Sequence, residues 1–333
     1  MFRWLSTTLN PEAYHGSGRR PPFFEGWYFK VVNAAGDRRY AVIPGIYLSR
    51  EPGGSHAFIQ ISDGTTGSAA YRSYPVGEFV PARKRFDVSI GRSRFSTGRM
   101  LVDIDGPELD FLSPVAWPVT LLSPGVMGWY AWMPFMECYH GVVSMDHGIR
   151  GGLTINGEYV SFDGGRGYTE KDWGRSFPSA WIWMQSNHFP ETGTSLSASM
   201  AVVPWIGRSF AGFTAGFLHR GRLLRFATYT GAVVEELSIT DHEVSWTIRD
   251  REHVLEITAT RAEGSLLLAP SVQAMDRRIT ETLTAAIEVR LHARSSGRSS
   301  TVFHGIGVNA GLEAAGDVAG LRDLWTRGLG VGS

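Results

Sequence analysis

The stretch Phe23-Phe24-Glu25-Gly26-Trp27-Tyr28-Phe29-Lys30-Val31-Val32 decides the fold class of this 333-residue chain. Aromatic and β-branched residues dominate it, which is typical of a β-strand. Similar runs at 39–48 and 56–62 follow, and turn-forming Gly, Pro, Asp and Asn residues separate them. We therefore predict strands at 23–32, 39–48 and 56–62, and an all-β protein.

The same kind of sequence returns in the second half of the chain. Aligning Trp27 with Trp183 gives an offset of 156 residues, and aligning Pro114 with Pro270 gives the same offset. A repeat of this length indicates two β-barrel or β-sandwich units of similar size. We place the first unit at residues 1–174 and the second at residues 175–333.

One amphipathic helix is expected near the C-terminus. Apolar side chains recur there at three- and four-residue spacing between Gly316 and Gly328. They are Val318, Leu321, Leu324 and Trp325. This short helix is predicted to pack against the second unit.

The composition excludes several classes of protein. The 32 Lys+Arg balance the 32 Asp+Glu, which leaves no excess positive charge for nucleic acid. Cys138 is the single cysteine, so neither an internal disulfide nor a four-cysteine zinc site can form. The N-terminus lacks the apolar core of a signal peptide, and no run reaches the roughly 18 apolar residues of a membrane span. We expect a cytoplasmic protein, and exposed aromatic residues would leave peripheral membrane contact open.

Four acidic residues are the candidates for chemistry. The two-residue alternation of strands places Glu25 and Glu137 on apolar faces, and it places Glu170 and Asp172 on the same face as Tyr168. Apolar surroundings raise the pKa of a carboxyl group, which keeps it protonated for general-acid work.

A structural role is the alternative for each of these acids. Arg166, Lys171 and Arg175 are close in sequence and would pair with a buried carboxylate. Glu170 and Asp172 lie next to the predicted domain junction, a location that favours a site.

Metal and cofactor binding are not expected from the sequence. Glu137, His140 and His147 do not have the spacing of a standard metal site. The glycine-rich segment 164–167 is not followed by a helix that would present its N-terminus to a phosphate, so we interpret it as a turn.

Four longer motifs carry a resemblance to a known family. They are the segments 23–30, 124–130, 134–145 and 164–183, which include Phe23-Phe24-Glu25-Gly26-Trp27-Tyr28 and Thr169-Glu170-Lys171-Asp172-Trp173-Gly174. In these motifs the chain resembles the tocopherol cyclase family. The similarity extends to 275–291 and is least clear over 192–268. More remotely, Glu170–Gly174 is similar to the acidic-x-x-Trp signature of carotenoid 1,2-hydratase and AttH-like proteins, which implies two tandem lipocalin-like antiparallel β-barrels.

The resemblance implies a reaction in which a prenylated hydroquinone closes to a chromanol without a cofactor. An acid would protonate the prenyl double bond, and the phenolic oxygen would capture the resulting cation. Glu170 or Asp172 is then the expected proton donor, with Glu25 and Glu137 in reserve.

Further residues would form the substrate site that this reaction implies. Tyr168, His140, Gln185 or Asn187 would orient or deprotonate the phenol. The expected walls of the pocket are aromatic, since aromatic faces stabilise a carbocation. They are Trp27, Tyr28, Trp129, Tyr139, Trp181 and Trp183.

Three functions stay open at this point. The first is the cyclase, and the second is a hydratase in which water captures the same cation. The third is a lipocalin-like carrier of a lipophilic quinol or terpenoid that does no chemistry. The partner expected in all three cases is a lipophilic small molecule, and no plastid-type leader is evident in the sequence.

Overall fold

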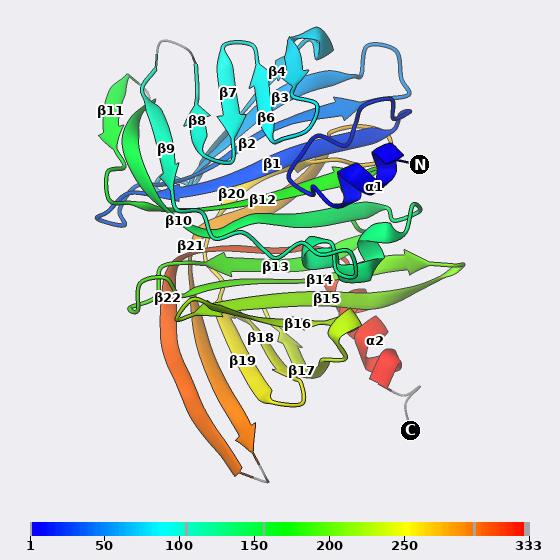
Figure 1. Ribbon diagram of the computed structural model, residues 1–333, viewed down its shortest axis with the longest axis vertical. Coiled ribbons are helices and arrows are strands. Elements are labelled where there is room, and N and C mark those ends of the chain that lie inside the picture. The colour runs from blue at the N-terminus through cyan, green and yellow to red at the C-terminus, as the bar shows by residue number, and fades with distance from the viewer. Residues whose placement is uncertain (1, 104–105, 156, 296–297, 330–333) are drawn as a thin grey trace. The chain divides into compact units, whose positions relative to one another are not determined.

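Strand β1 (Phe23–Val32) has the predicted bounds in the computed structural model, which describes residues 2–103, 106–155, 157–295 and 298–329. The predicted strands at 39–48 and 56–62 are also confirmed, as β2 (Arg39–Leu48) and β3 (His56–Asp63). Strands make up most of the described chain (Figure 1). The prediction of an all-β protein is therefore confirmed.

The remaining elements before residue 178 are α1 (Phe2–Thr8), β4 (Ser68–Tyr74), η1 (Val76–Glu78), β5 (Phe79–Pro81), β6 (Asp87–Ile90), β7 (Ser93–Ser96), β8 (Arg99–Leu101), β9 (Glu108–Leu112), η2 (Gly125–Trp132), β10 (Cys138–Ile155), β11 (Glu158–Ser161) and β12 (Arg166–Gly174). The later elements are β13 (Ala180–Ser186), β14 (Ser195–Trp205), β15 (Arg208–His219), β16 (Arg222–Ala227), η3 (Thr228–Thr230), β17 (Val233–Ile239), β18 (Glu243–Arg249), β19 (His253–Thr260), β20 (Ser265–Ala269), β21 (Arg277–Ser295), β22 (Arg298–Gly316) and α2 (Val318–Leu329).

The first sheet is antiparallel and follows the order β4-β3-β2-β1-β12-β10-β9-β8-β7-β6-β5, with β11 paired to β10. Alternate residues of β1, among them Trp27, Phe29 and Val31, belong to its hydrophobic core. Phe86 and Phe95 lie in the same core, where the Trp27 and Phe86 rings stack with centroids 4.8 Å apart. The other face of β1 carries Tyr28 and Lys30, so polar groups occupy this face.

The second sheet repeats the beginning of this order as β16-β15-β14-β13-β22-β21-β19-β18-β17. Its core is built from alternate residues of β13 and its neighbours, including Ile182, Met184 and Met200. In each sheet the first four strands in sequence run in adjacent positions, and a late strand pairs with the first of them. Two lipocalin-like antiparallel units in tandem are the architecture that results.

The predicted offset of 156 residues holds for some strands and not for others. It carries β2 onto β14, and core residues Tyr40 and Val42 onto core residues Leu196 and Ala198. It carries Trp27 onto Trp183, yet Trp27 is a core residue and the core face of β13 is that of Ile182. A shift of one residue moves every side chain to the other face of a strand, so the two tryptophans are not equivalent.

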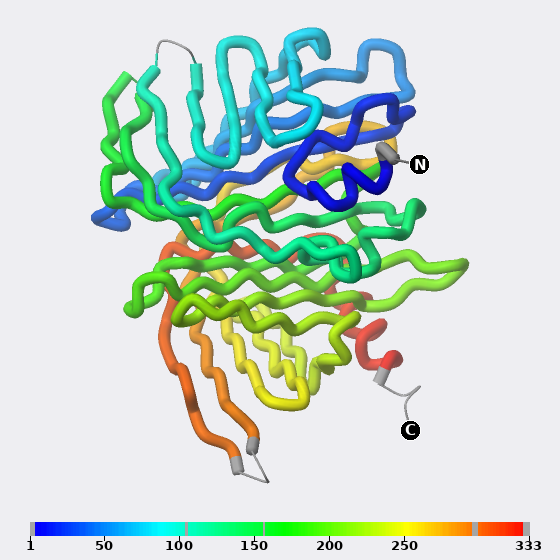
Figure 2. The backbone as a smooth tube through the Cα atoms, viewed as in Figure 1, coloured from blue at the N-terminus to red at the C-terminus, as the bar shows by residue number. Residues whose placement is uncertain are grey.

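The segment 265–279 departs from the predicted division at residue 174. By compactness the chain forms one unit of residues 1–177 with 265–279, and a second of 178–264 with 280–333. The Gln60 side chain on β3 holds β20 by donating to the Leu268 carbonyl and by accepting from the Leu268 amide at 2.8 Å. Figure 2 shows this segment, in gold, among the blue strands of the first unit. Because β20 has this place, the Pro114 and Pro270 anchor does not mark equivalent strands.

The predicted C-terminal helix is confirmed as α2. Asp317 caps its start, because its Oδ1 accepts from the Gly320 amide at 2.8 Å. Leu321 is fully buried in the core of the second unit, and Val318 and Trp325 pack beside it. The sequence analysis did not predict α1, which is a single short helix of seven residues. None of the helices in the described ranges has the length and apolar character needed to cross a membrane.

Candidate active site

Strand β12 lies between β1 and β10 and presents chemically different groups on its two faces. Lys171 and Trp173 point to the face that also carries Glu25 and Trp27 of β1. Tyr168, Glu170 and Asp172 point to the opposite face. The two faces therefore form two separate clusters of charged side chains.

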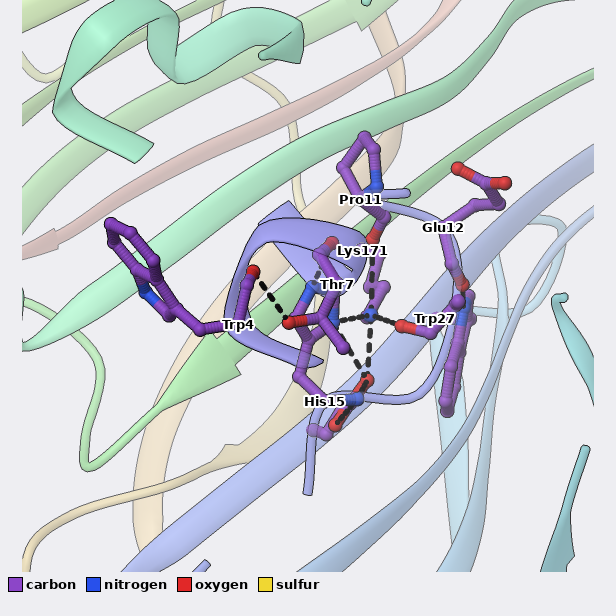
Figure 3. Close-up of polar contacts among 9 residues, drawn as sticks. Trp4, Thr7, Pro11, Glu12, His15, Trp27 and Lys171 are labelled. Carbon is purple, nitrogen blue, oxygen red and sulfur yellow. Dashed lines mark hydrogen bonds and ion pairs between the residues drawn. The ribbon is translucent and has the colours of Figure 1, made fainter. Parts of the chain in front are cut away.

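The first cluster is an ion pair in the interior of the first unit (Figure 3). Lys171 Nζ lies 2.6 Å from Glu25 Oε1, and both side chains are fully buried. The ammonium also donates to the carbonyl oxygens of Pro11 and Ala13. His15 Nδ1 is 2.7 Å away, and the His15 amide donates to the Glu25 carboxylate. The ion pair thus fixes the N-terminal segment to β1 and β12.

Aromatic rings complete this cluster. The ammonium of Lys171 lies 5.0 Å from the ring centroid of Trp27 and 4.5 Å from that of Trp173. Burial alone would raise the pKa of Glu25, but the Lys171 ammonium and the His15 contacts outweigh it and lower the pKa. The prediction of a raised pKa is therefore wrong for Glu25. Its environment is that of an ionised structural carboxylate paired with Lys171.

The second cluster joins Tyr168, Glu170, His140 and Asp172. The Tyr168 hydroxyl donates to Glu170 Oε2 at 2.6 Å. His140 comes from the neighbouring strand β10, where it is the register partner of Asp172. Its Nδ1 lies 2.9 Å from Asp172 Oδ1, and its Nε2 lies 3.8 Å from Glu170 Oε2. One imidazole therefore bridges two carboxylates on one face of the sheet.

The charge of this cluster is set by His140. Burial alone would lower its pKa, but the carboxylates of Asp172 and Glu170 raise it from 6.5 to about 9. The ring is therefore an imidazolium at neutral pH, and both of its nitrogens are donors. Only 6% of the Glu170 side chain is exposed, against 25% for Asp172. The more buried acid is thus Glu170, and the ion partner of the imidazolium is Asp172.

Two side chains of β1 border the second cluster. Tyr28 is the register partner of Glu170, and Lys30 is the register partner of Tyr168. Tyr28 is buried and Lys30 is fully buried. The sequence analysis included Tyr28 but missed Lys30. Lys30 lies two residues after Tyr28, so the two-residue alternation of strands would have placed it on the same face.

The remaining predicted residues of the first unit lie elsewhere. Tyr139 stacks on Trp173, 5.4 Å between centroids, on the face of the buried ion pair. Glu137 precedes β10 and accepts from the Ser176 hydroxyl at 2.7 Å. Trp27 belongs to the core, and Trp129 in η2 is 40% exposed and stacks on Tyr130. Among the described residues, the structure does not group these four side chains with the Glu170 cluster.

The predicted residues of the second unit share one side of β13. Trp181, Trp183 and Gln185 alternate with the core residues and so occupy the opposite face. The Trp181 indole donates to Glu313 Oε2 at 2.6 Å. Glu313 is the register partner of the fully buried Glu281, a pair of acids that the sequence analysis missed.

Asn187 is buried one residue beyond the end of β13.

The histidines do not form the metal site that the sequence analysis considered. His147 lies against Phe111 of the first core, 4.5 Å between centroids, and burial lowers its pKa to about 3. Potential ligand atoms of His140, Glu170 and Asp172 do lie within 4.8 Å of one another. This donor set would suit a divalent cation, which would compete with the proton on His140. The absence of a metal stays a prediction.

Comparison with solved structures agrees with this architecture of two lipocalin-like units. An AttH-type protein of Nitrosomonas europaea aligns with a TM-score of 0.52 over 91% of this chain and 95% of its own, at 12% identity. The structure of CghA with Sch210972 aligns with a TM-score of 0.51 over 89% of each chain, at 11% identity. At these identities the similarity shows the fold alone.

Sequence comparison gives the family. The model of the tocopherol cyclase-like family matches residues 112–316, which is more than half of the chain. The chain belongs to the tocopherol cyclase-like family, and family membership indicates an enzyme. The maize (Zea mays) protein named "Tocopherol cyclase, chloroplastic" is 32% identical over 157 residues, which cover 44% of this chain and 32% of the maize protein. Only about a third of that relative is matched, and a cytoplasmic location for this chain stays a prediction.

The buried ion pair generates the first prediction. Glu25→Gln should lower the free energy of unfolding by about 3–5 kcal/mol, because it leaves the Lys171 ammonium buried without its anion. Glu108→Gln is the control, since Glu108 pairs with Arg99 at the surface and its loss should cost less than about 1 kcal/mol. Urea unfolding measures both. Equal stability of the two variants would contradict the structural role of Glu25.

The second prediction concerns His140 and pH. A pKa raised from 6.5 to about 9 on folding stabilises the protein fully below pH 6.5, and this stabilisation is lost as pH rises through 9. It should amount to on the order of 3 kcal/mol. The test is the free energy of unfolding of the wild type relative to His140→Gln between pH 6 and pH 10. A difference independent of pH would show that His140 is not an imidazolium in the folded protein.

Proposed function

We propose that this protein is a cofactor-independent cyclase that closes a prenylated hydroquinone to a chromanol by protonating the prenyl double bond. The observation that carries the proposal is the partly buried cluster of Tyr168, Glu170, His140 and Asp172, which lies within the family-matched residues. Protonation of an alkene requires a strong acid kept away from water, and this cluster supplies a carboxyl group beside a cation.

Glu170 is the proton donor in this proposal. Asp172 is hydrogen-bonded to the imidazolium, whereas His140 Nε2 lies 3.8 Å from Glu170 Oε2. Asp172 is therefore the permanent counter-ion of His140. Proton transfer turns Glu170 into an anion, and the nearby imidazolium stabilises that anion and makes the acid stronger. Tyr168 donates to Oε2, so the transferable proton belongs on Oε1.

Aromatic side chains next to the acid stabilise the cation that forms. The proton adds to the less substituted alkene carbon, and a tertiary carbocation results. Tyr28 and Tyr168 flank Glu170, one across the ladder on β1 and one on the same strand. Their ring faces, together with the new Glu170 carboxylate, favour positive charge at this place.

Ring closure then restores the proton balance. The phenolic oxygen of the substrate attacks the carbocation, a C–O bond forms, and the phenol loses its proton. That proton returns to the Glu170 carboxylate, so the enzyme is regenerated and the product is an isomer of the substrate. The fully buried Lys30 side chain, across the ladder from Tyr168, would offer a hydrogen bond to the phenolic oxygen during this step.

Two other functions use the same residues differently. In a hydratase, water would capture the carbocation and the product would be heavier by one water. In a lipocalin-like carrier, the aromatic residues would bind the quinol and the acid would be dispensable. A product analysis separates all three.

The third prediction tests the cyclase directly. Purified protein is incubated with 2-methyl-6-phytyl-hydroquinone in detergent and deuterated water. We expect a chromanol with one deuterium on carbon, because the acid exchanges with solvent. Glu170→Gln should lower turnover at least about 10²-fold, since an amide cannot donate this proton. Glu158→Gln, an exposed carboxylate on β11, is the matched control and should leave turnover unchanged.

The outcomes discriminate between the candidates. A hydrated product supports the hydratase, and saturable binding without any product supports the carrier. Full activity of Glu170→Gln would exclude Glu170 as the donor. Asp172→Asn keeps Glu170 but removes the counter-ion of His140, so a smaller loss is expected for it.

A further inference from the structure

A long uncharged segment links β9 to β10. Residues 112–136 contain no Asp, Glu, Lys, Arg or His, although 19% of the whole chain is charged. Apart from Leu112, which ends β9, the segment lies outside the strands, and η2 is its only helical part among the described residues. A surface loop of this length is normally polar, so its composition needs a physical reason.

Much of this segment is exposed. Leu122 is 85% exposed and Leu121 is 64% exposed, which leaves two adjacent leucines in contact with solvent. We use the name apolar surface for the exposed hydrophobic side chains of the segment together with Trp4 of α1. They are Trp4, Leu112, Val115, Val119, Leu121, Leu122, Trp129 and Phe135. A cluster of this kind marks an interaction site.

Contacts within the first unit tie α1 to the segment. The Trp4 and Trp132 rings meet edge to face with centroids 5.1 Å apart. The Trp132 indole donates to the Leu121 carbonyl at 2.9 Å, which holds the loop that carries Leu121 and Leu122. Figure 3 shows the Trp4 side chain directed away from the buried cluster around Lys171. The exposed groups therefore sit on a supported surface.

We propose that the apolar surface docks this protein on a lipid bilayer. The observation that selects a bilayer is the absence of charge over 25 successive residues, because immersion then desolvates no ionised side chain. Trp, Leu and Phe are the residues that enter the boundary between headgroups and acyl chains.

Basic residues border the apolar surface. Arg19 and Arg20 are exposed, and the Arg19 guanidinium acts electrostatically on Tyr139. The Tyr139 hydroxyl donates to the Met133 carbonyl at 2.5 Å, next to Pro134 and Phe135. Cations at this edge would meet anionic headgroups. Docking would give access to a membrane-dissolved quinol, and this purpose rests on the proposed function. The proposal that the surface binds a bilayer does not rest on it.

Cosedimentation with lipid vesicles tests the docking, and it is the fourth prediction. The full-length protein is mixed with phosphatidylcholine vesicles and with vesicles containing phosphatidylserine. We expect binding to both and tighter binding to the second. Leu121→Glu/Leu122→Glu should weaken binding about tenfold or more, because two leucines no longer leave water. Ile206→Glu is the matched control, since Ile206 is 80% exposed in the second unit and should not affect binding.

Each outcome decides the proposal. Failure of the wild type to sediment with either vesicle would overturn it, as would equal binding by the double variant. A wild-type dimer that the double variant breaks, without vesicle binding, would show that a second copy covers the surface instead. Turnover of the double variant in detergent should equal that of the wild type. Vesicle binding without any cyclisation would leave docking intact and reject only the proposed function.

Discussion

The buried pairing of Lys171 with Glu25 is the interaction on which the site depends. It fixes β12 to β1, and the carbonyl oxygens of Pro11 and Ala13 bring the N-terminal segment to the same ammonium. Since neighbouring residues of a strand face opposite sides, fixing Lys171 inward directs Glu170 and Asp172 to the other face. A structural charge and a candidate catalytic charge are thus successive residues of one strand.

His140 supplies the positive charge on the face of β12 that carries Glu170 and Asp172. Three titratable groups share a small space. Asp172, which is hydrogen-bonded to the ring, keeps the imidazole charged, and in the proposed reaction Glu170 holds the proton that is donated. An isolated buried carboxyl group would be a weak acid toward an alkene. The imidazolium beside Glu170 compensates for this weakness by stabilising the conjugate base, and Asp172 balances the remaining charge.

Much of the fold could be predicted from the sequence because local patterns determine it. The alternation in 23–32 and the helical spacing from Val318 to Trp325 gave the right elements. The division into units could not be predicted at 265–279, because the bond between Gln60 and Leu268 joins residues about two hundred positions apart. The predicted equivalence of Trp27 and Trp183 is wrong for a related reason. A one-residue slip leaves hydrophobicity unchanged but reverses the face.

The site was predictable in part. Alternation put Glu170, Asp172 and Tyr168 together on β12, but it could not show that β10 brings His140 opposite Asp172, since pairing between strands is not a local property. It also kept Glu25 as a reserve proton donor, because alternation within one strand cannot show that the pairing of β1 with β12 brings Glu25 beside Lys171.

The charge state of His140 is the most direct test of this account. Nitrogen-15 NMR of histidine-labelled protein, assigned with His140→Gln, reports the protonation of both ring nitrogens. We predict an imidazolium at pH 7.5 that titrates near pH 9. A neutral ring at pH 7.5 would contradict the cluster as the source of an activated acid.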